Sequence, residues 1–457
     1  MNNFFDEKRI INNGPHEFRR LVQRFLLHCG LNVFSVDMPG DKGADLILEN
    51  GNERWGIQSK WVKDPEKTPN ISILDEMLSS MHEYNLNEVV AVTNTSFDKM
   101  TIKKLEEYKI INKFRMQAWD LNYLKKYFSE KKHIDKINSA KLRPYQQIAK
   151  EKIIDDLDKK KRALLYLATG LGKTVVASKV INHYLEKDSN IKILVLAHLN
   201  ELLEQLQRSI WNELSINIPT QIVNNLNQPE DELLGVTFAS NLSILKYIEY
   251  KDYYPDLVII DECHHISGDN TYNKIIEMLD DSLIVGVTAT PWRGDKFNIE
   301  SILGQPSYKC SIEEGMKQNY LAPVNYNLYQ DNINWQNVPE LSRYNYSIKE
   351  LNRKLFVIER DEKILDELSK TWDNTLCPKA IIFCQSIPHA ENILKLLRGF
   401  EKWKNSAILH SDLNKLDRKL ALMNFRKDDC SILVAVDILN EGIDVPNVNI
   451  ICFARVT

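Results

Sequence analysis

Polar residues that could bind a phosphate follow an apolar, strand-like segment in the first half of the chain. The run ALLYLAT leads into a turn containing Gly170 and Gly172, and Lys173 and Thr174 then open a helical pattern. A glycine-rich turn between a strand and a helix points backbone N–H groups at phosphate. We expect Lys173 to reach the β- and γ-phosphates of ATP and Thr174 to hold Mg²⁺. Because Leu167 replaces the usual first glycine, this turn alone fits an ordinary helix start equally well.

Two further strand-like runs end in polar residues. The run 257–260 delivers Asp261 and Glu262 at its end, and the run LIVGV leads into the TATP segment at 288–291. Open α/β sheets bind ligands beyond the carboxyl ends of their strands. We expect Asp261 to bind Mg²⁺, directly or through water, and Glu262 to orient and deprotonate an attacking water. A solvated acidic loop is the alternative, and three such strand ends together make it remote.

A second set of polar residues lies near the N-terminus, on two strand-like runs joined by a hairpin signal at 50–52. In one register of this hairpin Asp45 lies opposite Gln58, and in the other it lies opposite Gly56. Strand alternation places Asp45 on the sheet face of Gln58 and Lys60 in both registers. Asp45 and Gln58 could hold Mg²⁺ while Lys60 stabilises charge during phosphodiester hydrolysis. Spacing alone favours an exposed edge of ordinary polar residues.

The elements that must position these residues indicate an α/β chain of several domains. Buried-type runs alternate with helical patterns from about residue 142, which is typical of a doubly wound parallel sheet. A second series of such runs begins after about residue 375. We therefore expect an α/β domain at 1–129, a charged linker at 130–141, and two parallel-sheet lobes at 142–330 and 331–457.

Composition limits the class of protein. The 457 residues carry a net charge of −4, so any contact with a polyanion must come from local patches. Seven cysteines without a zinc-type cluster indicate a reducing, cytoplasmic setting. No apolar run is long enough to span a bilayer, so we expect no membrane partner.

The segment after the linker resembles the DEAD/DEAH-type superfamily-two helicases, in the branch of restriction-enzyme motors and repair translocases. The resemblance rests on ATGLGKT (168–174), DECH (261–264), TATP (288–291), LRPYQ (142–146), AIIFCQSIPHAE (380–391) and VAVDILNEGIDVP (434–446). It implies two RecA-like lobes, ATP as cofactor and double-stranded DNA as the tracked partner. It also implies that Gln146 reads the adenine base and that Gly442 and Asp444 face the nucleotide.

Three departures from the helicase pattern change what is expected. Leu199 stands where relatives usually carry Arg, which puts one contact to the tracked strand in doubt. Val436 replaces a frequent Thr and removes a hydroxyl. The sequence stops at FARVT, before the motif that supplies an arginine finger, so the second lobe is expected to be truncated. An arginine finger contributes roughly 10³–10⁵ in rate, and we therefore expect ATP binding to exceed turnover. A protein partner could bind through the part that is missing.

The first 125 residues resemble the Mrr-like branch of the PD-(D/E)xK nucleases. The match rests on GDKGADLIL followed by GIQSKW, with Asp45, Gln58 and Lys60 in the motif and Glu17 on the preceding helix. In this branch the acidic position of the last motif is often Gln. The resemblance implies a restriction-endonuclease-like α/β fold and Mg²⁺-dependent cleavage of DNA, although inactive DNA-binding members exist.

Three functions remain open from the sequence. The first is an ATP-driven DNA motor fused to an endonuclease, serving restriction or anti-phage defence. The second keeps the motor and makes the N-terminal domain an adaptor that binds DNA without cutting it. The third is an RNA-remodelling helicase whose N-terminus docks a partner. Cleavage that depends on Lys60, and the nucleic acid that stimulates ATP turnover, discriminate among them.

Overall fold

The chain divides into two compact units, Met1–Val324 and Asn325–Thr457. The computed structural model describes residues 4–36, 43–50, 53–112, 115–130, 141–229, 232–267, 270–290, 297–327, 358–426, 430–437, 445 and 447–454. The division falls close to the predicted start of the second lobe at 331. Most of the predicted linker lies outside the described residues, so the boundaries at 129 and 142 stay predictions.

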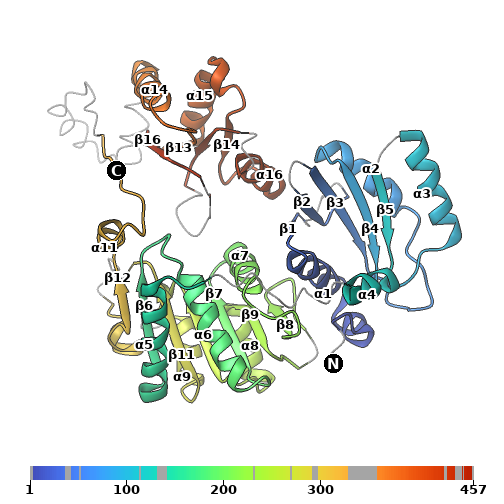
Figure 1. The fold of residues 1–457 in the computed structure, drawn as a ribbon, viewed down its shortest axis with the longest axis horizontal. Helices are drawn as coiled ribbons and strands as arrows, with labels where there is room; N and C mark the ends of the chain where they lie inside the picture. The colour runs from blue at the N-terminus through green and yellow to red at the C-terminus, as the bar shows by residue number, and fades with distance from the viewer. Residues whose placement is uncertain are drawn as a thin grey trace, which may run out of the picture. The chain divides into compact units, whose positions relative to one another are not determined.

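The first unit begins with a five-stranded mixed sheet flanked by helices (Figure 1). Strands β1, β2 and β3 are antiparallel neighbours, whereas β3, β4 and β5 run parallel. The elements of this N-terminal domain are α1 (Glu7–His28), β1 (Asn32–Ser35), β2 (Leu46–Asn50), β3 (Glu53–Lys60), α2 (Ile73–Glu83), β4 (Glu88–Thr93), α3 (Lys99–Asn112), β5 (Arg115–Trp119) and α4 (Leu121–Glu130).

Helix α1 is amphipathic and contains a break near its start. Asp6 caps its first turn by accepting a hydrogen bond from the backbone N–H of Arg9 at 2.8 Å. The helix then breaks at Gly14, whose φ of 76° and ψ of −165° are non-helical, and Pro15 restarts it. Its apolar stripe, which includes Phe18, Val22 and Phe25, is fully buried against the sheet.

The hairpin between β2 and β3 adopts one of the two predicted registers. Asn50 pairs with Glu53 and Leu46 with Ile57, so the pairing carried one residue further sets Asp45 opposite Gln58. β3 also pairs with β4, which makes it a central strand. Gln58 and Lys60, which are predicted to act in phosphodiester hydrolysis, therefore lie at the end of a strand that is paired with a neighbour on each side.

The rest of the first unit is a seven-stranded parallel sheet in the order β12-β6-β11-β10-β7-β9-β8. Apolar clusters pack on both of its faces, as expected for a doubly wound sheet. Its elements are α5 (Pro144–Lys160), β6 (Arg162–Leu167), α6 (Lys173–Lys187), β7 (Ile193–Ala197), α7 (Asn200–Trp211), β8 (Thr220–Val223), β9 (Val236–Ser240), α8 (Asn241–Tyr250), β10 (Leu257–Asp261), α9 (Thr271–Met278), β11 (Leu283–Thr288), α10 (Glu300–Leu303), β12 (Tyr308–Cys310) and α11 (Ile312–Lys317). We call this sheet and its helices the first lobe.

The second unit contains a four-stranded parallel sheet in the order β14-β15-β13-β16. We call it the second lobe. Its described elements are α14 (Ile358–Asp373), β13 (Ala380–Phe383), α15 (Ile387–Leu397), β14 (Ala407–Leu409), α16 (Lys415–Arg426), β15 (Ile432–Ala435) and β16 (Ile450–Phe453). The predicted α/β class, with a mixed-sheet domain followed by two parallel-sheet lobes, is confirmed.

Within the first unit, α1 docks the N-terminal domain onto the first lobe. The buried guanidinium of Arg24 donates at 2.8 Å to the carbonyl oxygens of both Ser215 and Ile218. Its Nη1 also donates to Thr220 Oγ1 at 3.2 Å, and the fully buried ring of Trp211 lies beneath Arg24, 5.9 Å from the guanidinium. Hydrogen bonds from a buried cation to backbone carbonyls have a fixed geometry, so they hold the two parts in one arrangement.

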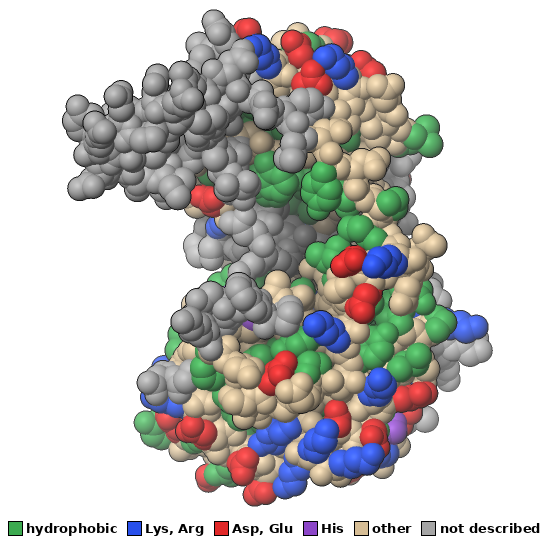
Figure 2. All heavy atoms as spheres, turned by 90° about the vertical axis from the view of Figure 1, so that its left-hand side faces the viewer, with side chains coloured by type: hydrophobic (Ala, Val, Ile, Leu, Met, Phe, Trp, Pro, Cys, Tyr) green, Lys and Arg blue, Asp and Glu red, His purple; other side chains and the backbone are tan. Residues whose placement is uncertain are grey.

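Charges of both signs are interspersed on the surface around α5. Figure 2 views the molecule from the side on which α5 lies in Figure 1, and Lys, Arg, Asp and Glu side chains are mixed over that face. On α5 itself, Lys159 pairs with Asp155 and Lys160 with Asp156, each at 2.7 Å. The described side chains of this face therefore form no continuous basic patch (Figure 2). Among the described helices, none has the length and apolar character needed to cross a membrane.

Candidate functional site

The phosphate-binding turn lies between β6 and α6, as predicted. Gly170 and Gly172 adopt φ values of 87° and 80°, a region that favours glycine, and α6 begins directly at Lys173 with Thr174 in its first turn. A Cβ added at Gly172 would lie 2.5 Å from Gln146 Nε2. The backbone conformation therefore favours glycine at this position, and a side chain there would displace the end of the Gln146 side chain on α5.

Residues from all three predicted strand ends meet beside this turn. Lys173 Nζ lies 3.0 Å from Glu262 Oε1, which joins the turn to the end of β10. His264 Nδ1 lies 3.2 Å from Glu262 Oε2 and 2.8 Å from Thr288 Oγ1, which joins β10 to the end of β11. One continuous polar network thus connects the segments ATGLGKT, DECH and TATP.

Asp261 and Glu262, at the end of β10, carry opposite pKa shifts. Burial, with the neighbouring Glu262 charge, raises the pKa of Asp261 to about 6. Burial alone would also raise the pKa of Glu262, but the hydrogen bond from His264 and the charge of Lys173 outweigh it and lower that pKa to about 2. Glu262 also has a φ of 46°, an uncommon conformation for a residue with a side chain. The site therefore keeps one carboxylate firmly ionised and another easily protonated.

Gln146, the predicted base reader, contacts the phosphate-binding turn itself. Its Nε2 donates to the carbonyl oxygen of Leu171 at 2.9 Å, and its Oε1 accepts from the backbone N–H of Arg143 at 2.9 Å. Tyr145 Oη donates to the same Leu171 oxygen at 2.8 Å. The first turn of α5 therefore supports the glycine-rich turn, and base reading by Gln146 stays a prediction.

The predicted nucleotide residues of the second lobe, Gly442 and Asp444, lie outside the described residues, as does Pro291 of the TATP segment. Leu199 stands immediately before α7 and is 49% exposed, so its apolar side chain reaches the surface where relatives carry Arg. Val436 is buried in the core of the second lobe. The departures at Leu199 and Val436 thus each have an identifiable place in the fold.

In the N-terminal domain, Asp45 is held at the start of the β2–β3 hairpin. Its Oδ2 accepts hydrogen bonds from Ser59 N at 2.5 Å and Ser59 Oγ at 2.7 Å, and its Oδ1 lies 3.5 Å from Arg19 Nη1. The sequence predicted that Asp45 shares a sheet face with Gln58 and Lys60, whereas its observed contacts are with Ser59 and Arg19. Because β2 begins only at Leu46, strand alternation does not fix the direction of the Asp45 side chain. Its carboxylate turns toward Ser59 and α1.

Gln58 and Lys60 meet a residue that the sequence reasoning missed. Gln58 Nε2 donates to Glu76 Oε2 at 2.8 Å, and Lys60 Nζ lies 2.7 Å from the same oxygen. Gln58 is only 5% exposed, and within the described part of the chain its Oε1 has no hydrogen-bond partner. Buried polar atoms are nearly always hydrogen-bonded in folded proteins, so this oxygen is a candidate ligand atom.

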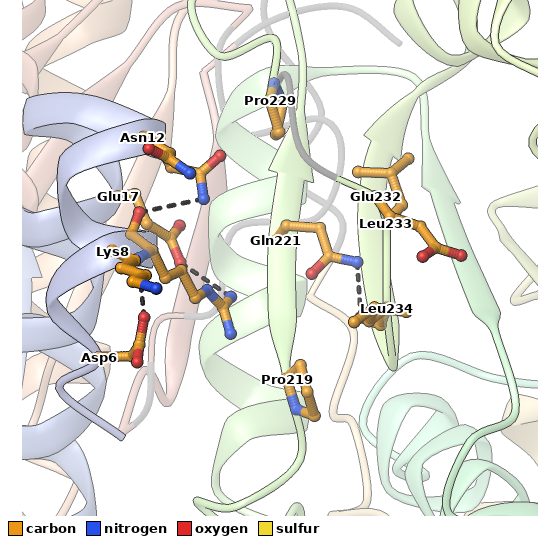
Figure 3. Close-up of a pocket in the computed structure, with 12 residues that line it drawn as sticks. Asp6, Lys8, Asn12, Glu17, Pro219, Gln221, Pro229, Glu232, Leu233 and Leu234 are labelled. Atoms are coloured by element: carbon orange, nitrogen blue, oxygen red, sulfur yellow. Dashed lines mark hydrogen bonds and ion pairs between the residues drawn. The ribbon is translucent and has the colours of Figure 1, made fainter. Parts of the chain in front are cut away.

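Glu17, the fourth predicted nuclease residue, is not brought to this cluster. Its carboxylate lies 2.9 Å from Arg9 Nη2 and 2.7 Å from Arg20 Nη1. Because α1 turns about 100° per residue, Glu17 and Arg19 lie on nearly opposite sides of the helix. Glu17 lines a cavity of about 270 Å³ between α1 and the first lobe, and Figure 3 shows it across that cavity from Gln221 of β8. Its observed contacts belong to the interface between domain and lobe.

The N-terminal residues fit a divalent metal bound through oxygen. Carboxylate and amide oxygens are the ligands that Mg²⁺ and similar hard cations prefer, and Asp45 and the unpartnered Gln58 Oε1 offer both kinds. Within the described ranges, no three His, Cys, Asp or Glu side chains form a metal-type cluster by themselves. A site here therefore needs the amide oxygen of Gln58 in addition to carboxylates.

Models of three protein families match consecutive parts of the chain. The model described as a restriction endonuclease matches residues 11–126. The model described as a type III restriction enzyme, res subunit, matches 139–293, and the helicase conserved C-terminal domain matches 359–457. The chain joins a restriction-endonuclease domain to the two lobes of a superfamily-two helicase. The endonuclease domain is the N-terminal mixed-sheet domain, and the helicase lobes are the two parallel-sheet lobes.

Two curated relatives each match more than half of the chain. The putative ATP-dependent helicase IRC3 of Saccharomyces cerevisiae is 26% identical over 69% of this chain and 47% of its own length. The type I restriction enzyme EcoAI endonuclease subunit of Escherichia coli is 28% identical over 56% of this chain and 34% of its own length. The chain thus spans less than half the length of these relatives.

A solved structure extends the likeness of fold to almost the whole chain. The ATP-dependent type ISP restriction-modification enzyme LlaBIII bound to DNA superposes with a TM-score of 0.53 at 18% identity. The match covers 99% of this chain and 35% of that one. At this identity the likeness concerns the fold alone.

Proposed function

We propose that this chain is an ATP-driven DNA motor whose N-terminal domain is a metal-dependent DNA endonuclease, acting in restriction or anti-phage defence. The proposal rests on one observation: a single compact unit contains both the proposed ATP-binding residues and the proposed nuclease residues. Lys173 lies against Glu262 in the first helicase lobe, and Gln58 lies beside Lys60 in the endonuclease domain. In the described part of the chain the seven cysteines form no disulfide, which agrees with work in a reducing cytoplasm.

In the proposed motor, the polar network around Glu262 handles the terminal phosphate of ATP. Lys173 leaves Glu262 to bind the β- and γ-phosphates, and Thr174 and Asp261 hold Mg²⁺. Glu262, which keeps its contact with His264, then orients the attacking water. His264 links Glu262 to Thr288 at the end of β11, so a change at the phosphate reaches the TATP segment.

In the proposed endonuclease, Asp45 and Gln58 hold Mg²⁺ and Lys60 positions the attacking water or stabilises the negative phosphorane. A bound divalent ion would supply Lewis-acid activation of the scissile phosphate. Arg19 and Ser59 fix the direction of the Asp45 carboxylate through their contacts with it. Removal of Lys60 should therefore abolish cutting while DNA binding remains.

A non-cleaving adaptor is the second candidate, and two ion pairs favour it. Lys60 is paired with Glu76 and Asp45 lies near Arg19, so both charges already have partners within the domain. Plasmid incubated with Mg²⁺ separates the two functions. The endonuclease predicts nicks in the wild-type chain and none in Lys60→Ala, whereas the adaptor predicts intact plasmid and equal DNA binding by both proteins.

The kind of nucleic acid is tested by ATP turnover. We expect double-stranded DNA to stimulate ATP hydrolysis by the wild-type chain and to have no effect on Lys173→Ala. Displacement of a triplex-forming strand from linear duplex reports movement along the DNA in the same reaction. Stimulation by RNA with no response to duplex DNA would overturn the DNA motor in favour of an RNA-remodelling helicase.

A further inference from the structure

Glu76, in the first turn of α2, contacts two proposed nuclease residues through a single oxygen. Its Oε2 accepts a hydrogen bond from Gln58 Nε2 at 2.8 Å and lies 2.7 Å from Lys60 Nζ. α2 connects the parallel strands β3 and β4, so this helix crosses the sheet beside the end of β3. Glu76 therefore reaches the proposed site from a separate element.

The contact with Glu76 decides how the Gln58 amide is oriented. The two ends of an amide have nearly the same shape, and only hydrogen bonding distinguishes them. An ionised carboxylate accepts hydrogen bonds and cannot donate one, so the NH₂ end of Gln58 must face Glu76. The oxygen end then points away from Glu76, and within the described residues it is buried without a partner. That end is the one able to bind a cation.

We propose that Glu76 is a positioning residue of the nuclease site, which holds Gln58 with its oxygen toward the metal and anchors Lys60. The proposal rests on the endonuclease function proposed above. The side chains of Glu76 and Lys60 are 33% and 36% exposed, so their ion pair is solvent-screened. The role therefore follows from geometry and does not depend on a strong ion pair.

The same contact accounts for an amide at position 58. A glutamate there would put a second carboxylate within hydrogen-bond distance of Glu76, and the two charges would repel each other. An amide donates where a carboxylate could not. Exchanging the two residue types, with Glu at 58 and Gln at 76, restores one donor and one acceptor.

The neighbouring Asp75 provides a matched control. It lies in the same turn of α2 and carries the same charge, but its Oδ1 accepts from Tyr108 Oη at 2.9 Å and lies 3.5 Å from Lys104 Nζ, both on α3. A general effect of charge at the start of the helix would appear equally in Asp75→Asn and Glu76→Gln. A positioning role appears in Glu76→Gln alone.

The test measures Mn²⁺ affinity and plasmid nicking for the full chain without nucleotide, with the Asp45→Asn variant marking the endonuclease signal. We expect Glu76→Gln and Gln58→Glu each to lose about tenfold in Mn²⁺ affinity and in nicking rate. The double variant Gln58→Glu/Glu76→Gln should return to within about threefold of wild type, and melting temperatures report folding.

Two outcomes would overturn the positioning role of Glu76, and a third would overturn the proposed endonuclease function as well. If the wild-type chain nicks and Glu76→Gln matches Asp75→Asn, or if the double variant is no better than either single variant, Glu76 does not position Gln58. If the wild-type chain neither nicks plasmid nor binds Mn²⁺ more tightly than Asp45→Asn, the endonuclease proposal fails and the role of Glu76 fails with it.

Discussion

At the scale of single residues, a side chain at position 172 would displace the amide of Gln146. Gly172 has a φ of 80°, and a Cβ there would lie 2.5 Å from the Gln146 amide nitrogen. That nitrogen also donates to Leu171 O inside the turn. The shape of the phosphate-binding turn thus depends on a side chain from the preceding helix.

Gly172→Ala is therefore predicted to weaken nucleotide binding beyond its effect on stability. Forcing a residue with a Cβ into a left-handed conformation costs about 1–2 kcal/mol. Gly30→Ala is the matched control, because Gly30 has a φ of 83° and open space around its Cβ position, and it ends α1 in a C-cap turn closed by a hydrogen bond from Leu31 N to Leu26 O. Both variants should lose similar unfolding free energy. Titration with a fluorescent ATP analogue should show a loss of about tenfold or more only for Gly172→Ala, and equal affinities would contradict this role of the contact.

His28, at the end of α1, is predicted to make the protein sensitive to acid. Burial and the nearby charge of Arg24 lower the pKa of His28 to about 3, whereas an unfolded His titrates near about 6.5. Between those values the unfolded state binds a proton that the folded state does not, so the free energy of unfolding falls as pH falls. His28→Gln should remove roughly 1–2 kcal/mol of the loss between pH 7.5 and 5. Urea unfolding at both pH values tests this, and an unchanged pH dependence would contradict it.

At the scale of elements, residue patterns predicted local structure better than contacts between elements. Alternation and turn residues predicted the β2–β3 hairpin, and apolar runs predicted β6, β7, β9, β10 and β11. Short strands such as β8 and β12 went unpredicted, because four or three residues carry too little periodicity. Asp45, Gln58 and Lys60 were predicted from the sequence. Glu76 was not, because a helical pattern does not tell which residue faces a distant strand end. The contacts of Glu17 were missed for the same reason.

The docking of α1 on the first helicase lobe leads to a prediction at this scale. Arg24 donates to Ser215 O, Ile218 O and Thr220 Oγ1. Arg24→Met leaves these buried acceptors without their donor and should cost roughly 2–4 kcal/mol. We expect proteolysis between the endonuclease domain and the lobe to speed up by at least tenfold, since the two parts would separate more often.

Arg115→Met is the control for this experiment. Arg115 pairs with Glu53 and Glu88 inside the endonuclease domain and is 55% exposed. Its loss should leave the proteolysis of the segment between domain and lobe unchanged. Equal protection of the wild-type chain and Arg24→Met would show that Arg24 does not hold the two parts together.

At the scale of the whole molecule, the endonuclease domain and the first helicase lobe share one compact unit, and the second lobe forms the other. Within the first unit, the hydrogen bonds of Arg24 connect the endonuclease domain to the first lobe. This arrangement suits a motor in which ATP-driven steps bring the cutting site to its target. In the first unit the proposed ATP residues and the proposed cutting residues lie on different sheets, so each can be disabled separately.

Plasmid cleavage in Mg²⁺, with and without ATP, tests the central claim most directly when the wild-type chain is compared with Lys60→Ala and Lys173→Ala. The fusion of motor and endonuclease predicts that Lys60→Ala cuts under no condition. It also predicts that Lys173→Ala loses only the part of cutting that ATP adds. Cleavage that survives in Lys60→Ala, or that responds to ATP equally in Lys173→Ala and the wild-type chain, would contradict it.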